Sequence, residues 1–169
     1  MPFLRAMPTV QLRDIAIDDD RRAVLGLRRG PGQERYLGSM ESHFEDAADE
    51  PRAKPRMWSV YDRDQLVGFV MISDGIEVLD DDLVGPYFLW RLLVDEQFQG
   101  RGYGAATIDA VVDYLRGRPG AELLFTSCKA GDGSPQGFYL RYGFVLTGET
   151  KWGEDLLSLD LSPRVRPTA

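Results

Sequence analysis

A glycine-rich run, Gln99–Ala105, constrains the fold of this chain most strongly, because it joins an apolar strand-like segment to an amphipathic helix. The strand is expected over Tyr87–Val94, and apolar residues at i, i+3, i+4 and i+7 from Ile108 to Leu115 make one helical face. No Ser, Thr, Asn or Asp caps the start of this helix, so its first amides lie unpaired at the positive end of the helix dipole. The sequence therefore predicts a site for an anion such as phosphate at this helix start.

Three kinds of glycine-rich phosphate-binding loop are known, and the spacing of their residues distinguishes them. The Walker pattern G-x-x-x-x-G-K-[S/T] is absent, because no Lys follows the glycines. A dinucleotide-binding fingerprint fits Gly100–Ala105 loosely, but it needs an acid at the end of the next strand, where this chain has Ser127–Lys129. The third pattern, Q-x-x-G-x-G, is matched by Gln99, Gly102 and Gly104.

A second motif follows the next expected strand, Leu123–Cys128, and lies on a short helix. Ser134 and Pro135 favour a helix start, and Gly143 favours its end. The stretch Phe138–Phe144 reads aromatic-Tyr-x-x-x-Gly-Phe. Together with the Q-x-x-G-x-G run, this stretch resembles the GNAT superfamily of acyl-CoA-dependent N-acetyltransferases, and the resemblance extends over roughly residues 58 to 161.

The resemblance implies an α+β (mixed α/β) fold, in which a mixed, largely antiparallel sheet of about seven strands is flanked by about four helices. Such a sheet is splayed between its fourth and fifth strands, here Tyr87–Val94 and Leu123–Cys128. A chain of 169 residues is expected to form one domain over residues 1–161, followed by a disordered tail over residues 162–169.

Hydrophobic periodicity and turn residues predict the remaining elements. The other expected helices are Asp18–Leu27 and Gln33–Ala48. The other expected strands are Thr9–Arg13, Met57–Tyr61, Leu66–Ser73, Val145–Thr150 and Leu156–Leu161. Gly68 lies inside one of these strands and is expected to mark a β-bulge.

Acetyl-CoA is the co-substrate that the resemblance implies. Its pyrophosphate is expected on Gln99, Gly100, Arg101, Gly102, Tyr103, Gly104 and Ala105. The backbone of the preceding strand end is implied for the amide arm of the cofactor and for the thioester oxygen, at Leu92, Leu93 and Val94. Tyr139 is implied as the general acid that protonates the departing thiolate of CoA.

The base that deprotonates the acceptor is not fixed by the sequence, although an amine with a pKa of about 10 must lose a proton before it attacks. In related spermidine/spermine acetyltransferases a glutamate four residues before the position of Val94 is proposed to assist, but Trp90 stands there in this chain. Trp90 is a candidate wall of the acceptor pocket. The candidate acceptor-site carboxylates are Glu77, Asp80, Asp81, Asp82 and Glu154. The alternatives are that these acids are solvated surface groups and that a chain of water carries the proton.

Within the superfamily the two motif regions look most like bacterial diamine or polyamine acetyltransferases. This implies direct transfer of the acetyl group to a primary amine in a ternary complex. An aminoglycoside, a protein N-terminus and a lysine side chain are alternative acceptors, because acceptor loops vary most. A non-catalytic acyl-CoA-binding regulatory module is an alternative of another class, and it would have no need of Tyr139.

The amino-acid composition limits the classes of molecule that this chain is expected to bind. A net charge of −7 argues against nucleic acid and favours a cationic partner, with solubility as the alternative reason for the acidity. One Cys and one His make a disulfide framework and a zinc site unexpected, so we expect no metal. No segment has the pattern of a membrane span or a signal peptide. We therefore expect a cytoplasmic monomer or homodimer without a membrane partner.

Three further side chains are interpreted as structural. Cys128 ends the strand that faces the expected thioester, and an inert buried thiol is favoured over an acyl-cysteine because no histidine is near in sequence. His43 is given no role. Arg91 interrupts an apolar strand, which predicts an edge-facing position or a pairing with an acid.

Overall fold

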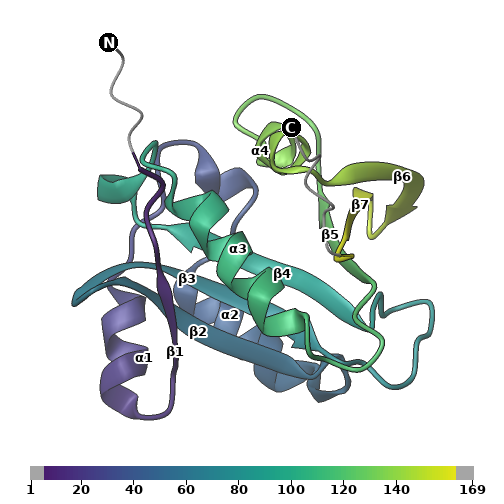
Figure 1. The fold of residues 1–169 in the computed structure, drawn as a ribbon, viewed down its shortest axis with the longest axis horizontal. Helices are drawn as coiled ribbons and strands as arrows, with labels where there is room; N and C mark the ends of the chain where they lie inside the picture. The colour runs from purple at the N-terminus through teal and green to yellow at the C-terminus, as the bar shows by residue number, and fades with distance from the viewer. Residues whose placement is uncertain (1–5, 163–169) are drawn as a thin grey trace, which may run out of the picture.

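A seven-stranded sheet organises residues 6–162, the part of the chain that a computed structural model describes (Figure 1). Its order is β1-β2-β3-β4-β5-β7-β6. The strands are β1 Gln11–Asp14, β2 Pro55–Asp62, β3 Gln65–Asp74, β4 Tyr87–Val94, β5 Leu123–Cys128, β6 Val145–Lys151 and β7 Glu154–Asp160. Neighbouring strands are antiparallel except β4 and β5, which confirms the mixed, largely antiparallel sheet. The expected tail lies outside the described residues from position 163 onward.

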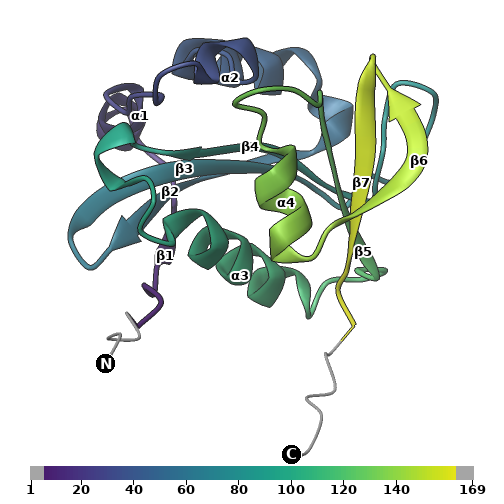
Figure 2. The same ribbon diagram turned by 90° about the horizontal axis from the view of Figure 1, so that it is seen from above.

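Four α-helices cover the two faces of the sheet (Figure 2). On one face lie α1 (Asp18–Leu25) and α2 (Met40–Asp49), and on the other lie α3 (Tyr103–Leu115) and α4 (Gln136–Tyr142). Each face has its own apolar core, with Ile108 and Leu115 of α3 in one and Phe44 of α2 in the other. Three 3₁₀ turns complete the chain, η1 (Gln33–Arg35), η2 (Pro51–Ala53) and η3 (Glu96–Phe98). None of the helices among residues 6–162 has the length and hydrophobicity needed to cross a bilayer.

The expected helix Gln33–Ala48 is wrong as a single element. The chain forms the short turn η1, leaves helical geometry, and begins α2 only at Met40. The reason is a cap within the predicted span: Ser39 is extended and its hydroxyl accepts a hydrogen bond from the Ser42 amide at 3.1 Å. The Ser39 cap therefore starts a new helix within the apolar pattern, and η1 is a separate element.

Other boundaries differ by one or two residues at the ends of elements, as in β1, α1 and β7. The bulge expected at Gly68 is confirmed in β3, where the extra residue is its neighbour Val67. The helix expected to begin at Pro135 begins one residue later, at Gln136, with Pro135 as its N-cap, and the Ser134 hydroxyl accepts a hydrogen bond from the Gln136 amide at 3.1 Å.

The sheet is split between β4 and β5. The two strands pair at a single position, Phe88 with Phe125, and the Thr126 hydroxyl donates to the Leu89 carbonyl at 3.0 Å just beyond it. Because no further pair follows in this parallel contact, the two strands diverge from Leu89 to Val94. The predicted splay is thus confirmed, and it leaves the β5-facing edge of β4 open.

A second bulge lies in β4 itself. The register against β3 passes from Arg91 opposite Met71 to Leu89 opposite Ile72, so Trp90 is the extra residue. One inserted residue shifts the alternation of side chains along a strand. As a result Trp90 packs against the α2 core, and the next side chain, Arg91, also contacts α2.

Candidate active site

The split between the strands opens into a cleft of about 810 Å³, which we call the central cleft. Its walls come from β4, from the start of α3, and from the end of β5 with the following α4. Residues from both faces of the sheet line it, since Tyr103 belongs to the α3 side and Leu37 packs on the α2 side. The cleft therefore reaches side chains that belong to both faces of the sheet.

The glycine run forms one end of the central cleft. Gly100 and Gly102 both have positive φ, at 72° and 89°, which glycine adopts without strain. Gly102 is the N-cap of α3, and no side chain caps this helix. The uncapped first turn and the open space at Gly100 fit a phosphate, which would bind the free amides. Position 104 requires glycine for a different reason, because a Cβ there would lie 3.0 Å from the Phe138 ring of α4.

Most of the residues predicted to hold acetyl-CoA line this cleft, and two do not. Leu92, Val94, Gln99, Gly100, Gly102, Tyr103, Gly104 and Ala105 line it. Leu93 does not line the cleft, because its side chain is buried in the α2 core and its carbonyl lies against Gly68 of β3. Arg101 is exposed and its guanidinium lies 5.6 Å from the centre of the Phe98 ring, outside the lining.

Gln99 uses its side chain within the protein. Its amide nitrogen donates to the Val94 carbonyl at 2.9 Å and to the Gln33 side-chain oxygen at 2.9 Å. It thus fixes the end of β4 and links it to η1. A phosphate at this loop would be held by backbone amides rather than by the Gln99 side chain.

Tyr139 lies in the wall of the central cleft near the end of β5. It is buried, with 7% of its surface exposed, and it packs against Phe144 and Phe138. Burial raises the pKa of its hydroxyl above the ordinary value, and the neighbouring Cys128 thiol adds to this. The hydroxyl therefore stays protonated at neutral pH, which is the state that a general acid requires.

Glu154 and Cys128 share this part of the cleft. Glu154 starts β7, lines the cleft, and accepts a hydrogen bond from the Ser127 hydroxyl at 2.6 Å. Burial, followed by the nearby Glu154 carboxylate, raises the pKa of the Cys128 thiol to about 11. A thiol with that pKa is protonated and a poor nucleophile at neutral pH, in agreement with its interpretation as inert.

Arg91 is paired with an acid, which was one of the two positions that the sequence predicted for it. Its guanidinium lies 3.1 Å from the Asp46 carboxylate of α2, and its Nε donates to His43 Nδ1 at 3.1 Å. Burial, together with the adjacent guanidinium, lowers the pKa of His43 to about 4. His43 is therefore neutral at pH 7 and acts as an acceptor that holds Arg91 in the cleft wall.

A smaller pocket of about 350 Å³, which we call the acidic annex, adjoins the central cleft. The two spaces share the side chains of Phe88, Trp90, Arg91 and Trp152. Four carboxylates line the annex, and they come from the end of α2 and from the loop before β4: Asp46, Asp49, Glu50 and Asp82. The sequence analysis did not identify Asp46, Asp49 and Glu50 as site residues. The feature that could have indicated them is an acidic last turn of α2 that contains no basic residue.

The predicted acceptor-site residues are separated by the structure. Glu154 and Trp90 line the central cleft, and Trp90 and Asp82 line the annex. The others line neither space, since Glu77 pairs with Lys54, Asp80 pairs with Arg52 at 2.9 Å, and Asp81 is exposed. The five candidate carboxylates therefore do not line one common space, because neighbouring side chains in a loop point in different directions.

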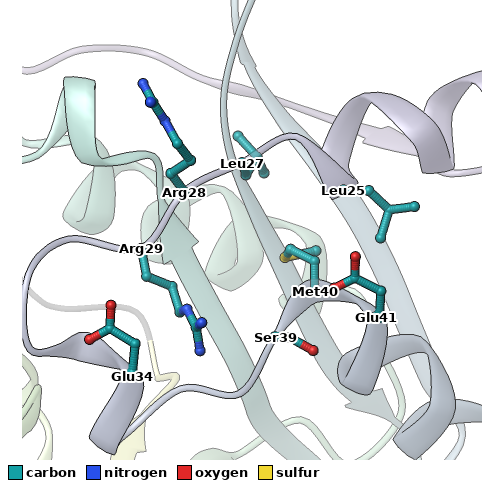
Figure 3. Close-up of a pocket in the computed structure, with 8 residues that line it drawn as sticks. All are labelled: Leu25, Leu27, Arg28, Arg29, Glu34, Ser39, Met40 and Glu41. Atoms are coloured by element: carbon teal, nitrogen blue, oxygen red, sulfur yellow. The ribbon is translucent and has the colours of Figure 1, made fainter.

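A third hollow of about 290 Å³ lies between the segment after α1 and the start of α2 (Figure 3). All of its lining residues fall between positions 25 and 41, with Arg28 and Arg29 balanced by Glu34 and Glu41. Neither motif contributes to it. This hollow lies behind η1, because Glu34 lines it while Gln33 and Arg35 line the central cleft.

Comparison with known proteins agrees with this geometry. The model of the acetyltransferase (GNAT) family matches residues 12–144. The chain therefore belongs to the GNAT family and is an acetyl-CoA-dependent N-acetyltransferase. Acetyl-CoA is its co-substrate, as in the family members solved with coenzyme A.

Particular relatives narrow the comparison. A spermine/spermidine N(1)-acetyltransferase of Bacillus subtilis strain 168 is 30% identical over 145 residues, which cover 85% of this chain and 94% of that protein. The structure of spermidine N-acetyltransferase from Vibrio cholerae, in complex with CoA and spermine, has a TM-score of 0.60 and 17% identity, and the match covers 91% of this chain and 96% of that one. The PaiA N-acetyltransferase of Thermoplasma acidophilum, in complex with coenzyme A, has a TM-score of 0.61, 12% identity, and coverages of 90% and 99%. The two structural matches establish the shared fold.

Proposed function

We propose that this protein transfers the acetyl group of acetyl-CoA, bound in the central cleft, directly to a primary amine of a diamine or polyamine. The acidic annex carries the proposal, because it places four carboxylates beside the middle of the cleft. An acceptor with a second ammonium group can occupy the annex while its reacting nitrogen reaches the cleft. The name of the Bacillus subtilis relative supports the same acceptor class.

The charge of the annex is not fully balanced within the protein. Asp46 pairs with Arg91 and Glu50 pairs with Arg52, which lowers the pKa of Glu50. Among the ion pairs of residues 6–162, none involves Asp49 or Asp82. The C-terminal end of α2 adds partial negative charge, so acids there oppose the helix dipole. Such an arrangement disfavours the helix locally and favours a bound cation.

In the proposed reaction the amine nitrogen attacks the thioester carbonyl, the new C–N bond forms and the C–S bond breaks. Glu154 holds the reacting ammonium and accepts its proton, since its carboxylate lines the cleft beside Tyr139. The Tyr139 hydroxyl gives its proton to the departing thiolate, and the second proton that the attacking nitrogen loses returns to Tyr139 through water. The open edge of β4 supplies backbone amides for the developing oxyanion. Products are the N-acetylamine, free CoA and one proton.

The test measures CoA thiol release from acetyl-CoA with a polyamine, a monoamine, an aminoglycoside and a basic peptide as acceptors. We expect the polyamine to have the largest kcat/KM. Replacing Asp49 and Asp82 together by Asn should lower this value about tenfold, or about 1.4 kcal/mol, because two unpaired charges of the annex are removed. The monoamine should respond much less.

Asp81→Asn is the matched control, because Asp81 lies in the same loop as Asp82 and lines neither space. It should keep the polyamine kinetics of the unchanged protein. Equal losses for polyamine and monoamine, or turnover only with the aminoglycoside or the peptide, would contradict the proposed acceptor class.

A further inference from the structure

A short segment, η1 together with Tyr36, touches both walls of the central cleft, and we call it the 33–36 bridge. At one end the Gln33 side-chain oxygen accepts from Gln99 at 2.9 Å, and Gln99 is anchored on the Val94 carbonyl of β4. At the other end the Tyr36 hydroxyl donates to the Asp132 carbonyl at 2.8 Å, in the loop between β5 and α4. The bridge therefore links the two sides of the split.

Polar contacts, rather than packing, hold this bridge in place. None of the residues of η1 is buried. The hollow of Figure 3 lies on one side of the turn, and the central cleft lies on the other. Because open space lies on both sides, the position of the bridge depends on the contacts at its ends. Among residues 6–162, the Tyr36 hydroxyl makes the only hydrogen bond from the bridge to the β5 side.

The loop that receives Tyr36 is shaped for this contact. It rises from the sheet toward the layer of α2 (Figure 2). A Cβ at Gly131 would lie 3.0 Å from the Tyr36 hydroxyl, and one at Gly133 would lie 3.8 Å from the same ring. Gly131 has a φ of 140°, a conformation that side chains rarely adopt. The two glycines thus let the backbone approach the tyrosine closely.

We propose that the 33–36 bridge covers the reacting thioester and keeps water away from it, with Tyr36 as the positioning residue. The proposal rests on the placement of acetyl-CoA in the central cleft given above. Water competes with the amine: its oxygen attacks the acetyl carbonyl, the C–S bond breaks, and acetate and CoA thiol are released. A cover over the thioester suppresses this side reaction and leaves the annex as the route for the acceptor.

The test is acceptor-independent CoA release from acetyl-CoA by Tyr36→Phe, which removes one hydroxyl. We expect release to rise about fivefold or more while the Kd of acetyl-CoA stays within about twofold, because water exclusion changes and phosphate binding does not. Tyr142→Phe is the matched control, since it also removes one hydroxyl, from an exposed bond to Asp109. It should leave the hydrolysis unchanged.

Gly131→Ala breaks the same contact from the opposite side and should raise the hydrolysis as well. Its control is Gly120→Ala, which replaces another glycine of positive φ, with nothing within 4 Å of the added Cβ. Folded Tyr36→Phe and Gly131→Ala proteins that bind acetyl-CoA and hydrolyse it at the original rate would overturn the bridge proposal. Loss of acetyl-CoA binding to the unchanged protein would instead refute the placement of acetyl-CoA, and the choice of acceptor affects neither result.

Discussion

The central cleft and the acidic annex adjoin each other but are built by different means. The cleft is made from strand edges, two glycines of positive φ and an uncapped helix start, so its binding groups are mostly backbone. The annex is made from side chains, with carboxylates contributed by α2 and by the loop before β4. A site for a constant co-substrate can rest on backbone geometry, whereas selection among amines needs charges placed by particular side chains.

The two spaces meet at one short stretch of β4. The bulge at Trp90 turns two consecutive side chains toward α2, and Arg91 there contacts both His43 and Asp46. Trp90 and Arg91 line both spaces. Substitutions of residues that line only the cleft should change chemistry or acetyl-CoA affinity, and substitutions of Asp49 and Asp82, which line only the annex, should change acceptor kinetics.

The largest effect is expected from Tyr139→Phe. This change keeps the buried ring and removes the proton that, in the proposed reaction, the thiolate takes, so kcat should fall on the order of 10²-fold or more. The Kd of acetyl-CoA, measured by calorimetry, should stay within about twofold, since the ring packing is retained.

Cys128→Ala is the companion variant, because Cys128 lies beside Tyr139 and its raised pKa makes it a poor nucleophile. It should remain active. A dead alanine variant, together with an acetylated Cys128 peptide in the mass spectrum of the unchanged protein, would contradict direct transfer.

The next effect concerns acetyl-CoA affinity. Gly102→Val adds bulk at the α3 start, where φ is 89° and a Cβ would lie 3.2 Å from Pro8. We expect the Kd of acetyl-CoA to rise at least about tenfold, which is about 1.4 kcal/mol. Gly120→Val carries a similar backbone strain away from the cleft and should bind normally, so equal affinities of the two folded variants would remove the phosphate site from this loop.

A smaller effect is expected from salt. If annex charges attract a polycation, kcat/KM for a polyamine should fall several-fold as ionic strength rises, because the screening length is already about 8 Å at 0.15 M. A monoamine should change less. The Asp49→Asn, Asp82→Asn double variant should lose most of this salt dependence, and a slope equal to that of the unchanged protein would place the attraction elsewhere.

The smallest effect on activity, and a measurable one on stability, is expected from His43. Folding lowers its pKa from 6.5 to about 4, so the unfolded chain binds one more proton in this interval. The stability from neutral His43 is complete above pH 6.5 and is lost as the pH falls through that range toward 4. Urea unfolding across these pH values should show a shallower decline in His43→Gln, and identical slopes would contradict the assignment.

Most of the residues that the sequence singled out line the cleft, because they lie in short local segments. Glycine spacing, an uncapped helix start and the aromatic motif around Tyr139 each lie within a few residues, and each has a fixed backbone consequence. Strand alternation likewise predicted the order and type of most elements. Where local signals competed, as when the Ser39 cap interrupted an apolar pattern, the prediction of one long helix was wrong.

The annex and the bridge were decided only by the tertiary structure. Asp46 and Asp82 are far apart in sequence and meet because α2 packs on the same face of β4 that the loop before β4 approaches. The bulge at Trp90 shifts the alternation of side chains along β4 and turns Arg91 toward α2, and no residue type in the sequence indicates this bulge. Tyr36 and Asp132 are 96 positions apart and meet across the split. The sequence by itself determined the local chemistry of the glycine run and of the aromatic motif, and packing determined which distant charges face the cleft, because side-chain direction depends on register and on contacts between elements.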